Sequence, residues 1–421
     1  MLGAIRDAEW LTAGRARAWC RCLAVVSVVC VLAWVAMAHG VYDSRGRPLG
    51  MDFSNFWVAA HLAHEGHAAA VYDAGSYEAV HRSFFPDTTL PYLYLPYPPP
   101  FLLLAAPFAT LPYRVALLVW LALGFGAFFV ALRSLVPERS AIMPIVAFPA
   151  VLVTCSMGQN GFLTAACLGG GMVLAGRRPF VAGLCLGLLV FKPHLLLAAP
   201  IALFAARRWT IVAGVIVSVT STCGLSFAVF GKDAWLGFLR VSQSYQGMGK
   251  GFVGIAFWQM DSAFAAVRVL QGSAGLAFVV QGVVALAALA VLFKVAWRKP
   301  GAYAEGAALI AATVLCTPYL LDYDLVCLAF PMAWVLTQAQ RSGWLPWEKS
   351  ALLMAYVMPF FGRPMAFATH LPVGPLVLGS LLVVVVRRAQ LSELKQSRDV
   401  SSPLTEMTLP RPPSNASRES L

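Results

Sequence analysis

The feature that most constrains this chain is a repeated alternation of long apolar runs with short basic clusters. Pairs of arginines close apolar runs at 177–178, 207–208 and 387–388. A helix needs roughly 20 mostly apolar residues to cross a bilayer, and the pattern predicts about twelve such spans. The predicted spans lie near 22–40, 113–133, 140–157, 161–176, 179–191, 194–206, 209–230, 274–294, 303–317, 323–338, 344–361 and 371–387. The short, Pro-bounded run 98–111 is expected to be re-entrant or interfacial instead.

Composition and charge support this all-helical membrane protein and give it an orientation. Apolar residues make up 59% of the chain and charged residues only 12%, whereas soluble domains carry about 25% charged residues. A soluble enzyme and a disordered regulator are therefore excluded. With the N-terminus in the cytoplasm, the whole formal net charge of +12 falls on the cytoplasmic side, as the positive-inside rule requires. The basic excess thus indicates topology, and no nucleic-acid partner is expected.

The chain divides into one membrane domain and a tail. The domain covers 1–388, and its first outer loop, 41–97, is expected to carry interfacial helices. The stretch 389–421 is rich in Ser, Pro and charge without helical periodicity, so we expect a disordered cytoplasmic tail. Both termini are then cytoplasmic.

Unusual polar residues collect on the predicted outer side of the membrane. Polar side chains near a bilayer core are costly and tend to mark function. They come from six separate segments, namely the loop 41–97, the turn 158–161, the boundary 191–194, the loop 231–273, the stretch 318–324 and the loop around 363–370. Their convergence at one depth predicts a catalytic or binding cavity open to the outside. A transporter would instead place its polar site near the midplane.

Asp52 opens the stretch Asp52-Phe53-Ser54-Asn55-Phe56-Trp57 directly after the first span. The apolar spacing that follows predicts a helix on the membrane surface. Asp52 has two interpretations, as the N-cap of that helix or as a general base that takes a proton from a sugar hydroxyl. Residue chemistry alone does not choose between them.

Basic and amide side chains at the other outer segments also have two interpretations each. Lys192 and His194 flank Pro193 at a span boundary, where they could reach the aqueous interface or bind a lipid-linked phosphate, and Arg363 is a further phosphate candidate. Gln159 and Asn160, between two glycines, form a tight turn or a hydrogen-bonding tip.

The acids Asp322 and Asp324 flank Tyr323. They could cap a helix, order sugar hydroxyls, hold a divalent cation or pair with Lys192. The spacing of His61, His64 and His67 favours solvated or interfacial side chains over zinc ligands, because His67 drifts off the face shared by the other two. No metal site is predicted.

Several stretches together resemble glycosyltransferase family 87, within the C-type superfamily of multi-span enzymes that use lipid-phosphate sugars. The matching stretches are DFSNFWVAAHLAHEGHAAAVYD at 52–73, YPPPFLLLAAPFATLPYRVALLVW at 97–120, GQNGFLTAACLGGG at 158–171, GLLVFKPHLLLAAPIAL at 187–203 and TPYLLDYDLV at 317–326. Members of that family often show His where this chain has the DYD triplet. The resemblance implies a polyprenyl-phosphate-mannose-dependent mannosyltransferase fold and activity, without an obligatory metal or other cofactor.

The resemblance and the residues together predict an enzyme of the bacterial inner membrane with a periplasmic active site. It would move a sugar, most plausibly mannose, from a polyprenyl-phosphate donor to a glycolipid or glycan acceptor, with inversion. Asp52 is expected to be the general base, and Lys192, His194 and Arg363 to bind the donor phosphate. The residues expected to hold sugar or acceptor are Asn55, Trp57, Gln159, Asn160, Tyr319, Asp322 and Asp324. The alternatives are a transporter or flippase of lipid-linked sugars and a non-catalytic membrane partner.

Overall fold

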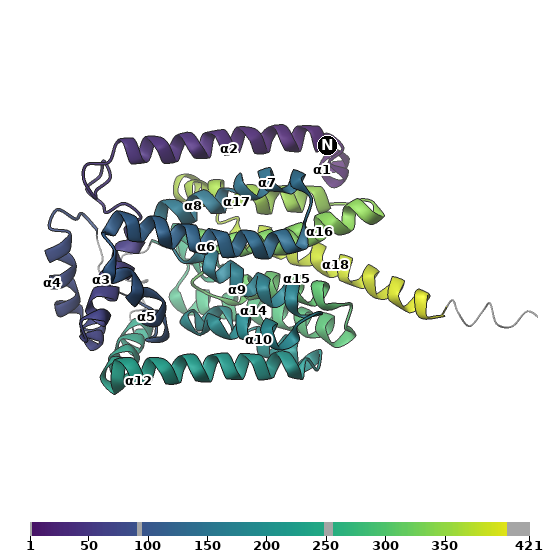
Figure 1. Cartoon of the computed structure of the whole chain (residues 1–421). Helices are drawn as coiled ribbons and strands as arrows, with labels where there is room; N and C mark the ends of the chain where they lie inside the picture. The colour runs from purple at the N-terminus through teal and green to yellow at the C-terminus, as the bar shows by residue number, and fades with distance from the viewer. Residues whose placement is uncertain (1, 91–94, 248–255, 402–421) are drawn as a thin grey trace, which may run out of the picture.

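The computed structural model describes residues 2–90, 95–247 and 256–401, and every regular element among them is a helix (Figure 1). Six helices are long and apolar enough to cross a membrane. They are α2 (Ala13–Ala36), α6 (Tyr113–Leu135), α12 (Trp209–Gly247), α14 (Ala274–Arg298), α17 (Glu348–Thr369) and α18 (Gly374–Ser401). A seventh span forms if η3 (Arg139–Ala141) with α7 (Ile142–Val146) and α8 (Pro149–Met157) cross together, bent by 51°.

The predicted number of about twelve spans is not confirmed, because five of the predicted spans fold into shorter pieces. α9 (Gly161–Leu174) has 14 residues and is about 21 Å long at 1.5 Å per residue, which is less than the roughly 30 Å of a bilayer core. Both α9 and α15 (Ala302–Cys316) are largely buried by other helices. The remaining pieces are α10 (Pro179–Gly187), η4 (Leu188–Phe191), η5 (Pro193–Leu195), α11 (Ala199–Ala205), η7 (Asp322–Leu328) and α16 (Ala329–Ser342). An apolar sequence does not distinguish burial in protein from burial in lipid.

The first outer loop folds over one end of the bundle, opposite the end that holds the N-terminus (Figure 1). Its elements, with the segment that follows, are α3 (Met51–His64), η1 (Ala68–Tyr72), α4 (Ala74–Phe84), α5 (Pro100–Ala105) and η2 (Ala106–Thr110). We predicted that the first of these helices lies on the membrane surface. Instead α3 is buried on nearly all sides, with Phe53 through Ala60 all buried, because α5, η1, η2 and α6 pack around it.

Close backbone approaches hold the bundle together. Gly183 of α10 and Gly214 of α12 face each other, and a Cβ on Gly183 would lie 2.1 Å from the carbonyl oxygen of Ile211. Small residues at such crossings let the helices pack closely. This packing stabilises the bundle, because in lipid there is no hydrophobic driving force between helices. Figure 1 places α12 and α2 on opposite sides of the bundle.

The end of the bundle away from the first outer loop contains ion pairs between separate segments of the chain. Arg388 of α18 and Glu348 of α17 form a fully buried ion pair, and Arg208 makes two hydrogen bonds to Glu305, at 2.8 and 2.9 Å. The start of α17 also contacts α1 (Leu2–Asp7), where Trp347 donates its backbone N–H to Arg6. α18 continues past the predicted domain boundary at 388 and ends at Ser401, and the rest of the predicted tail lies outside the described residues.

Candidate active site

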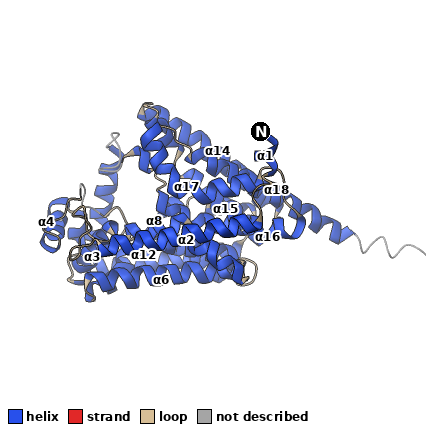
Figure 2. Cartoon of the chain, turned by 90° about the horizontal axis from the view of Figure 1, so that it is seen from above, coloured by secondary structure: helices blue, strands red, loops and turns tan. Residues whose placement is uncertain are grey.

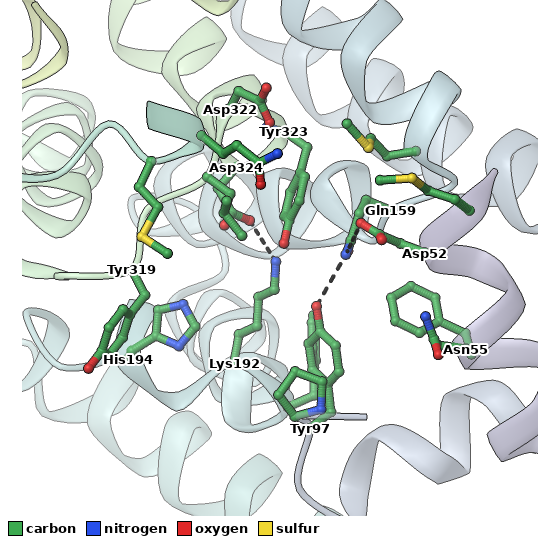
Figure 3. Close-up of a pocket in the computed structure, with 18 of the residues that line it drawn as sticks. Asp52, Asn55, Tyr97, Gln159, Lys192, His194, Tyr319, Asp322, Tyr323 and Asp324 are labelled. Carbon is green, nitrogen blue, oxygen red and sulfur yellow. Dashed lines mark hydrogen bonds and ion pairs between the residues drawn. The ribbon is translucent and has the colours of Figure 1, made fainter. Parts of the chain in front are cut away.

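A cavity of about 200 Å³ lies at the end of the bundle that carries the first outer loop (Figure 3). Its lining comes from segments that are far apart in the sequence. The residues that matter below are Asp52, Asn55, Tyr97, Gln159, Lys192, His194, Tyr319, Asp322, Asp324 and Arg363. The prediction that polar side chains of separate segments converge in one cavity is therefore met by the geometry of this region.

Asp52 lies in the first turn of α3 and points into the cavity, where Nε2 of Gln159 donates a hydrogen bond of 3.0 Å to its Oδ2 atom (Figure 3). The hydroxyl of Tyr97 donates in turn to Oε1 of Gln159 at 3.4 Å. Asp52 does not cap α3, because Gly50 occupies the N-cap and no side chain caps the helix. The capping interpretation is therefore wrong, and the carboxylate is available for chemistry.

Lys192 is held between an acid and two aromatic rings. Its Nζ atom lies 2.6 Å from Oδ1 of Asp324, and both side chains are 3% exposed. The same atom lies 5.0 Å from the ring centre of Tyr323 and 5.9 Å from that of Tyr97, within cation–π range. The pairing with Lys192 that was one interpretation of the acids is therefore present for Asp324.

Arg363 reaches the cavity from α17. One of its nitrogens donates to Oδ2 of Asp322 at 3.3 Å, and its guanidinium lies 5.3 Å from the ring centre of Trp258. Asp322 is fixed from its other oxygen, which accepts the backbone N–H of Tyr323 at 3.0 Å. Among the described residues Arg363 makes this single hydrogen bond, so most of its five N–H donors have no acceptor within that part of the chain.

Burial makes Asp52, Asp261 and Asp322 harder to ionise. It raises the pKa of Asp52 to about 6, although the Gln159 hydrogen bond lowers it again in part. Burial and the neighbouring Asp322 raise the pKa of Asp261 to about 8 against the opposing effect of Arg363. Asp52 is thus poised to exchange a proton near neutral pH, as a general base must.

Two predicted sugar-binding residues lie outside this cavity. Trp57 is 8% exposed, donates its indole N–H to Leu111 at 3.2 Å and stacks on His61 with ring centres 3.9 Å apart. Asn160 is buried behind Gln159 at the N-cap of α9. Both side chains therefore belong to the packing around the site and not to its surface.

A comparison with known protein families identifies the family of this chain. The model of glycosyltransferase family 87 matches residues 94–318, more than half of the chain. The chain belongs to glycosyltransferase family 87. It is accordingly a glycosyltransferase with several membrane-spanning helices. No curated protein and no solved structure matches it significantly.

Within this family 87 enzyme, the matched segment covers Gln159, Lys192 and His194, while Asp52 and Arg363 lie on either side of it. The fold closes the gap, because all five line the same cavity. The predicted family and enzyme class are confirmed. The roles of individual site residues stay predictions.

Three functional candidates were missed by the sequence analysis. Tyr97 touches the Asp52–Gln159 pair, Asp261 interacts electrostatically with Asp322 and Arg363, and Trp258 covers Arg363. The usable signal for Tyr97 was its position between Pro96 and Pro98, which fixes the backbone. Asp261 and Trp258 are ordinary members of a long polar loop, and nothing local distinguishes them.

Gly158→Ala is expected to destabilise this family 87 enzyme and to lower its transfer rate. Gly158 has φ +65°, and a Cβ there would lie 2.6 Å from Cβ of Phe53, in the helix that carries Asp52. The left-handed conformation alone costs about 1–2 kcal/mol for an alanine. Thermal unfolding in detergent measures the loss, with Gly126→Ala as control because its Cβ would meet nothing within 4 Å. Equal melting temperatures for the two variants would contradict this account.

Proposed function

We propose that this enzyme transfers a sugar, most plausibly mannose, from a polyprenyl-phosphate donor to a hydroxyl group of a glycolipid or glycan acceptor, with inversion at the anomeric carbon. The single observation that carries the proposal is the shared cavity, in which a proton-accepting carboxylate (Asp52) and two cations (Lys192 and Arg363) face one small volume. Inverting transfer needs both, a base for the acceptor and positive charge for the departing phosphate.

In this mechanism Asp52 takes the proton of the acceptor hydroxyl. The acceptor oxygen attacks the anomeric carbon from one face while the bond from that carbon to the phosphate oxygen breaks on the other. The electron pair of that bond leaves with polyprenyl phosphate, whose negative charge grows. Gln159 holds Asp52 in place through the 3.0 Å hydrogen bond, so the carboxylate keeps one orientation through the step.

The donor phosphate is proposed to bind Arg363 first. Lys192 is engaged by Asp324 at 2.6 Å, whereas Arg363 is 3.3 Å from Asp322, and a phosphate displaces the more loosely held acid more easily. Lys192 lines the same cavity and contributes positive charge around the leaving group, whereas His194, whose pKa burial lowers to about 4, would contribute a ring N–H donor. Asn55, Tyr319, Asp322 and Asp324 also line it and are the candidates to bind sugar or acceptor hydroxyls.

We propose that the cavity faces the periplasm of a bacterial inner membrane and that both termini are cytoplasmic. The basic clusters support this orientation, because Arg207, Arg208, Arg387 and Arg388 lie toward the end away from the cavity, where a positive-inside arrangement requires them. A transporter of lipid-linked sugars would need access from both sides of the membrane, whereas these polar side chains gather near one end.

The test is a transfer assay with purified protein, radiolabelled polyprenyl-phosphate-mannose and a membrane glycolipid extract. Label is expected to move from the lipid phosphate to a glycolipid product, and product analysis should show the inverted anomer. The same assay with labelled polyprenyl-phosphate-glucose and -galactose identifies the sugar. If no lipid-phosphate sugar donates label, the proposed function is wrong.

The transfer rate is expected to fall as pH drops through about 6. Asp52 acts as a base only when ionised, and burial raises its pKa to about 6, so kcat/KM should be nearly level above pH 7. Below pH 6 it should decline by about tenfold per pH unit. Initial rates between pH 4.5 and 8, with size-exclusion profiles to confirm integrity, measure this. A rate that stays level down to pH 4.5 would show that the base ionises elsewhere.

A further inference from the structure

A second, largely apolar hollow of about 380 Å³ lies on the membrane-facing side of the catalytic cavity. Its walls come from α2, α8 and α17, which Figure 2 shows near one another. The lining residues used below are Val31, Met157, Asp322, Phe360 and Arg363. We call this hollow the α2 groove.

The α2 groove adjoins the catalytic cavity. Met157, Asp322 and Arg363 line both. The groove therefore begins at a charged guanidinium and runs outward along Val, Leu, Trp, Phe and Pro side chains. A ligand that fits it has an anionic head and an apolar chain, which is the chemistry of a lipid phosphate.

The outer wall of the α2 groove packs loosely. No residue of α2 is buried, and Val28, Val29 and Leu32 are each more than half exposed. The contacts of α2 with the bundle are mainly with α7 and α8. A chain dissolved in the bilayer can therefore enter between α2 and α17 without crossing water.

Two lipid substrates could in principle use this groove, and the position of the charged residues separates them. The acceptor hydroxyl must reach Asp52, and Asp52 does not line the α2 groove. The donor phosphate must reach a cation, and Arg363 lies where groove and cavity meet. The geometry therefore favours the donor as occupant.

We infer that the α2 groove holds the isoprenoid units next to the phosphate of the lipid-linked donor, with that phosphate against Arg363. This inference rests on the proposed function. The groove accounts for only the part of the chain nearest the phosphate, and the remainder lies in lipid. It also leaves the part of the cavity lining that the groove does not share, which includes Phe238 and Tyr319, for the acceptor.

Photocrosslinking tests the placement directly. The probe is polyprenyl-phosphate-mannose with a diazirine in the second isoprene unit from the phosphate, incubated with the full-length protein and irradiated. Crosslinked peptides are expected to cover 30–34, 152–157 and 359–364, and excess unlabelled donor should suppress them. Crosslinks concentrated instead around Phe238 and Tyr319 would assign that side to the donor and overturn the inference.

A matched pair of variants tests the groove by function. Val31 lines the groove, whereas its neighbour Leu32 is 63% exposed toward lipid. Val31→Trp fills the groove and should raise KM for a long-chain donor by about tenfold or more, a change of 1.4 kcal/mol in binding. The effect should be smaller for a donor with a single isoprene unit. Leu32→Trp adds the same bulk outside the groove and should change KM less than about twofold.

The outcomes separate this inference from the proposed function. If wild-type protein transfers label but Val31→Trp and Leu32→Trp have the same KM, the groove is not the donor site. If Val31→Trp does not fold, the crosslinking pattern of the wild type still decides. If wild-type protein neither transfers label nor is crosslinked by the donor probe, the proposed function fails together with the inference.

Discussion

Replacing Asp52 by Asn is expected to lower the transfer rate by roughly 10²–10⁴-fold, the usual loss when a general base is removed. Asparagine has nearly the same shape and keeps an oxygen that can accept the hydrogen bond from Gln159, so the fold should survive. It cannot accept the proton of the acceptor hydroxyl. The loss should appear in kcat, with little change in KM for the donor, because Arg363 and the α2 groove are untouched.

The control for this variant is Asp87→Asn. Asp87 is an exposed acid of the same first outer loop and lies outside the lining of the cavity. Its replacement removes the same charge and should leave the rate within about twofold. If Asp52→Asn transfers sugar at nearly the wild-type rate, Asp52 is not the base, and another group accepts the proton of the acceptor hydroxyl.

Replacing Lys192 by Met is expected to cost about 3–5 kcal/mol of stability, because it leaves the carboxylate of Asp324 buried without its partner. Asp324 is 3% exposed, so water does not compensate. The double variant Lys192→Met with Asp324→Leu removes both charges and should recover most of this loss. Thermal unfolding in detergent measures all three proteins.

An exposed ion pair provides the comparison. Arg82 and Glu78 on α4 are about half exposed at 2.8 Å, and Arg82→Met should cost no more than about 1 kcal/mol. The double variant at 192 and 324 should recover stability but transfer sugar more slowly than the wild type, because the positive charge of Lys192 near the leaving phosphate is lost. A double variant as unstable as Lys192→Met alone would show that the cost comes from lost packing and not from the stranded charge.

The numbers of acids and cations in the cavity determine how the donor phosphate can bind. Among the described residues that line the cavity, the acids Asp52, Asp322 and Asp324 outnumber Lys192 and Arg363, so these residues offer the donor no surplus positive charge. A phosphate must compete with Asp322 for Arg363, and this competition favours the transition state, in which phosphate charge is greatest. Burial and Asp322 raise the pKa of Asp261, which disfavours a further negative charge beside this pair.

Local sequence was sufficient for several features of this enzyme. The apolar runs predicted a helical membrane protein because backbone groups in lipid must be paired within the segment, and the structure describes helices throughout. Five stretches together predicted family 87, and the family match covers those at 97–120, 158–171 and 187–203 completely. Asp52, Lys192 and Arg363 were selected as rare charges beside apolar runs, and all three line the cavity.

Other features depended on contacts between distant segments. Lys192 and Asp324 lie 132 positions apart, and no periodicity links them. Trp57 and Asn160 lie close in sequence to residues of the site. In the fold both side chains are buried, and neither lines the cavity.

The amino-acid sequence by itself determined that the chain is a membrane-embedded glycosyltransferase of family 87, because composition, charge asymmetry and short motifs are properties of contiguous segments. Only the tertiary structure decided that six or seven helices are long enough to span, which acid pairs with which cation, and that an apolar groove opens beside Arg363. The physical reason is the same in each case. A run of apolar residues specifies that it leaves water, whereas its neighbours are chosen by packing across the whole fold.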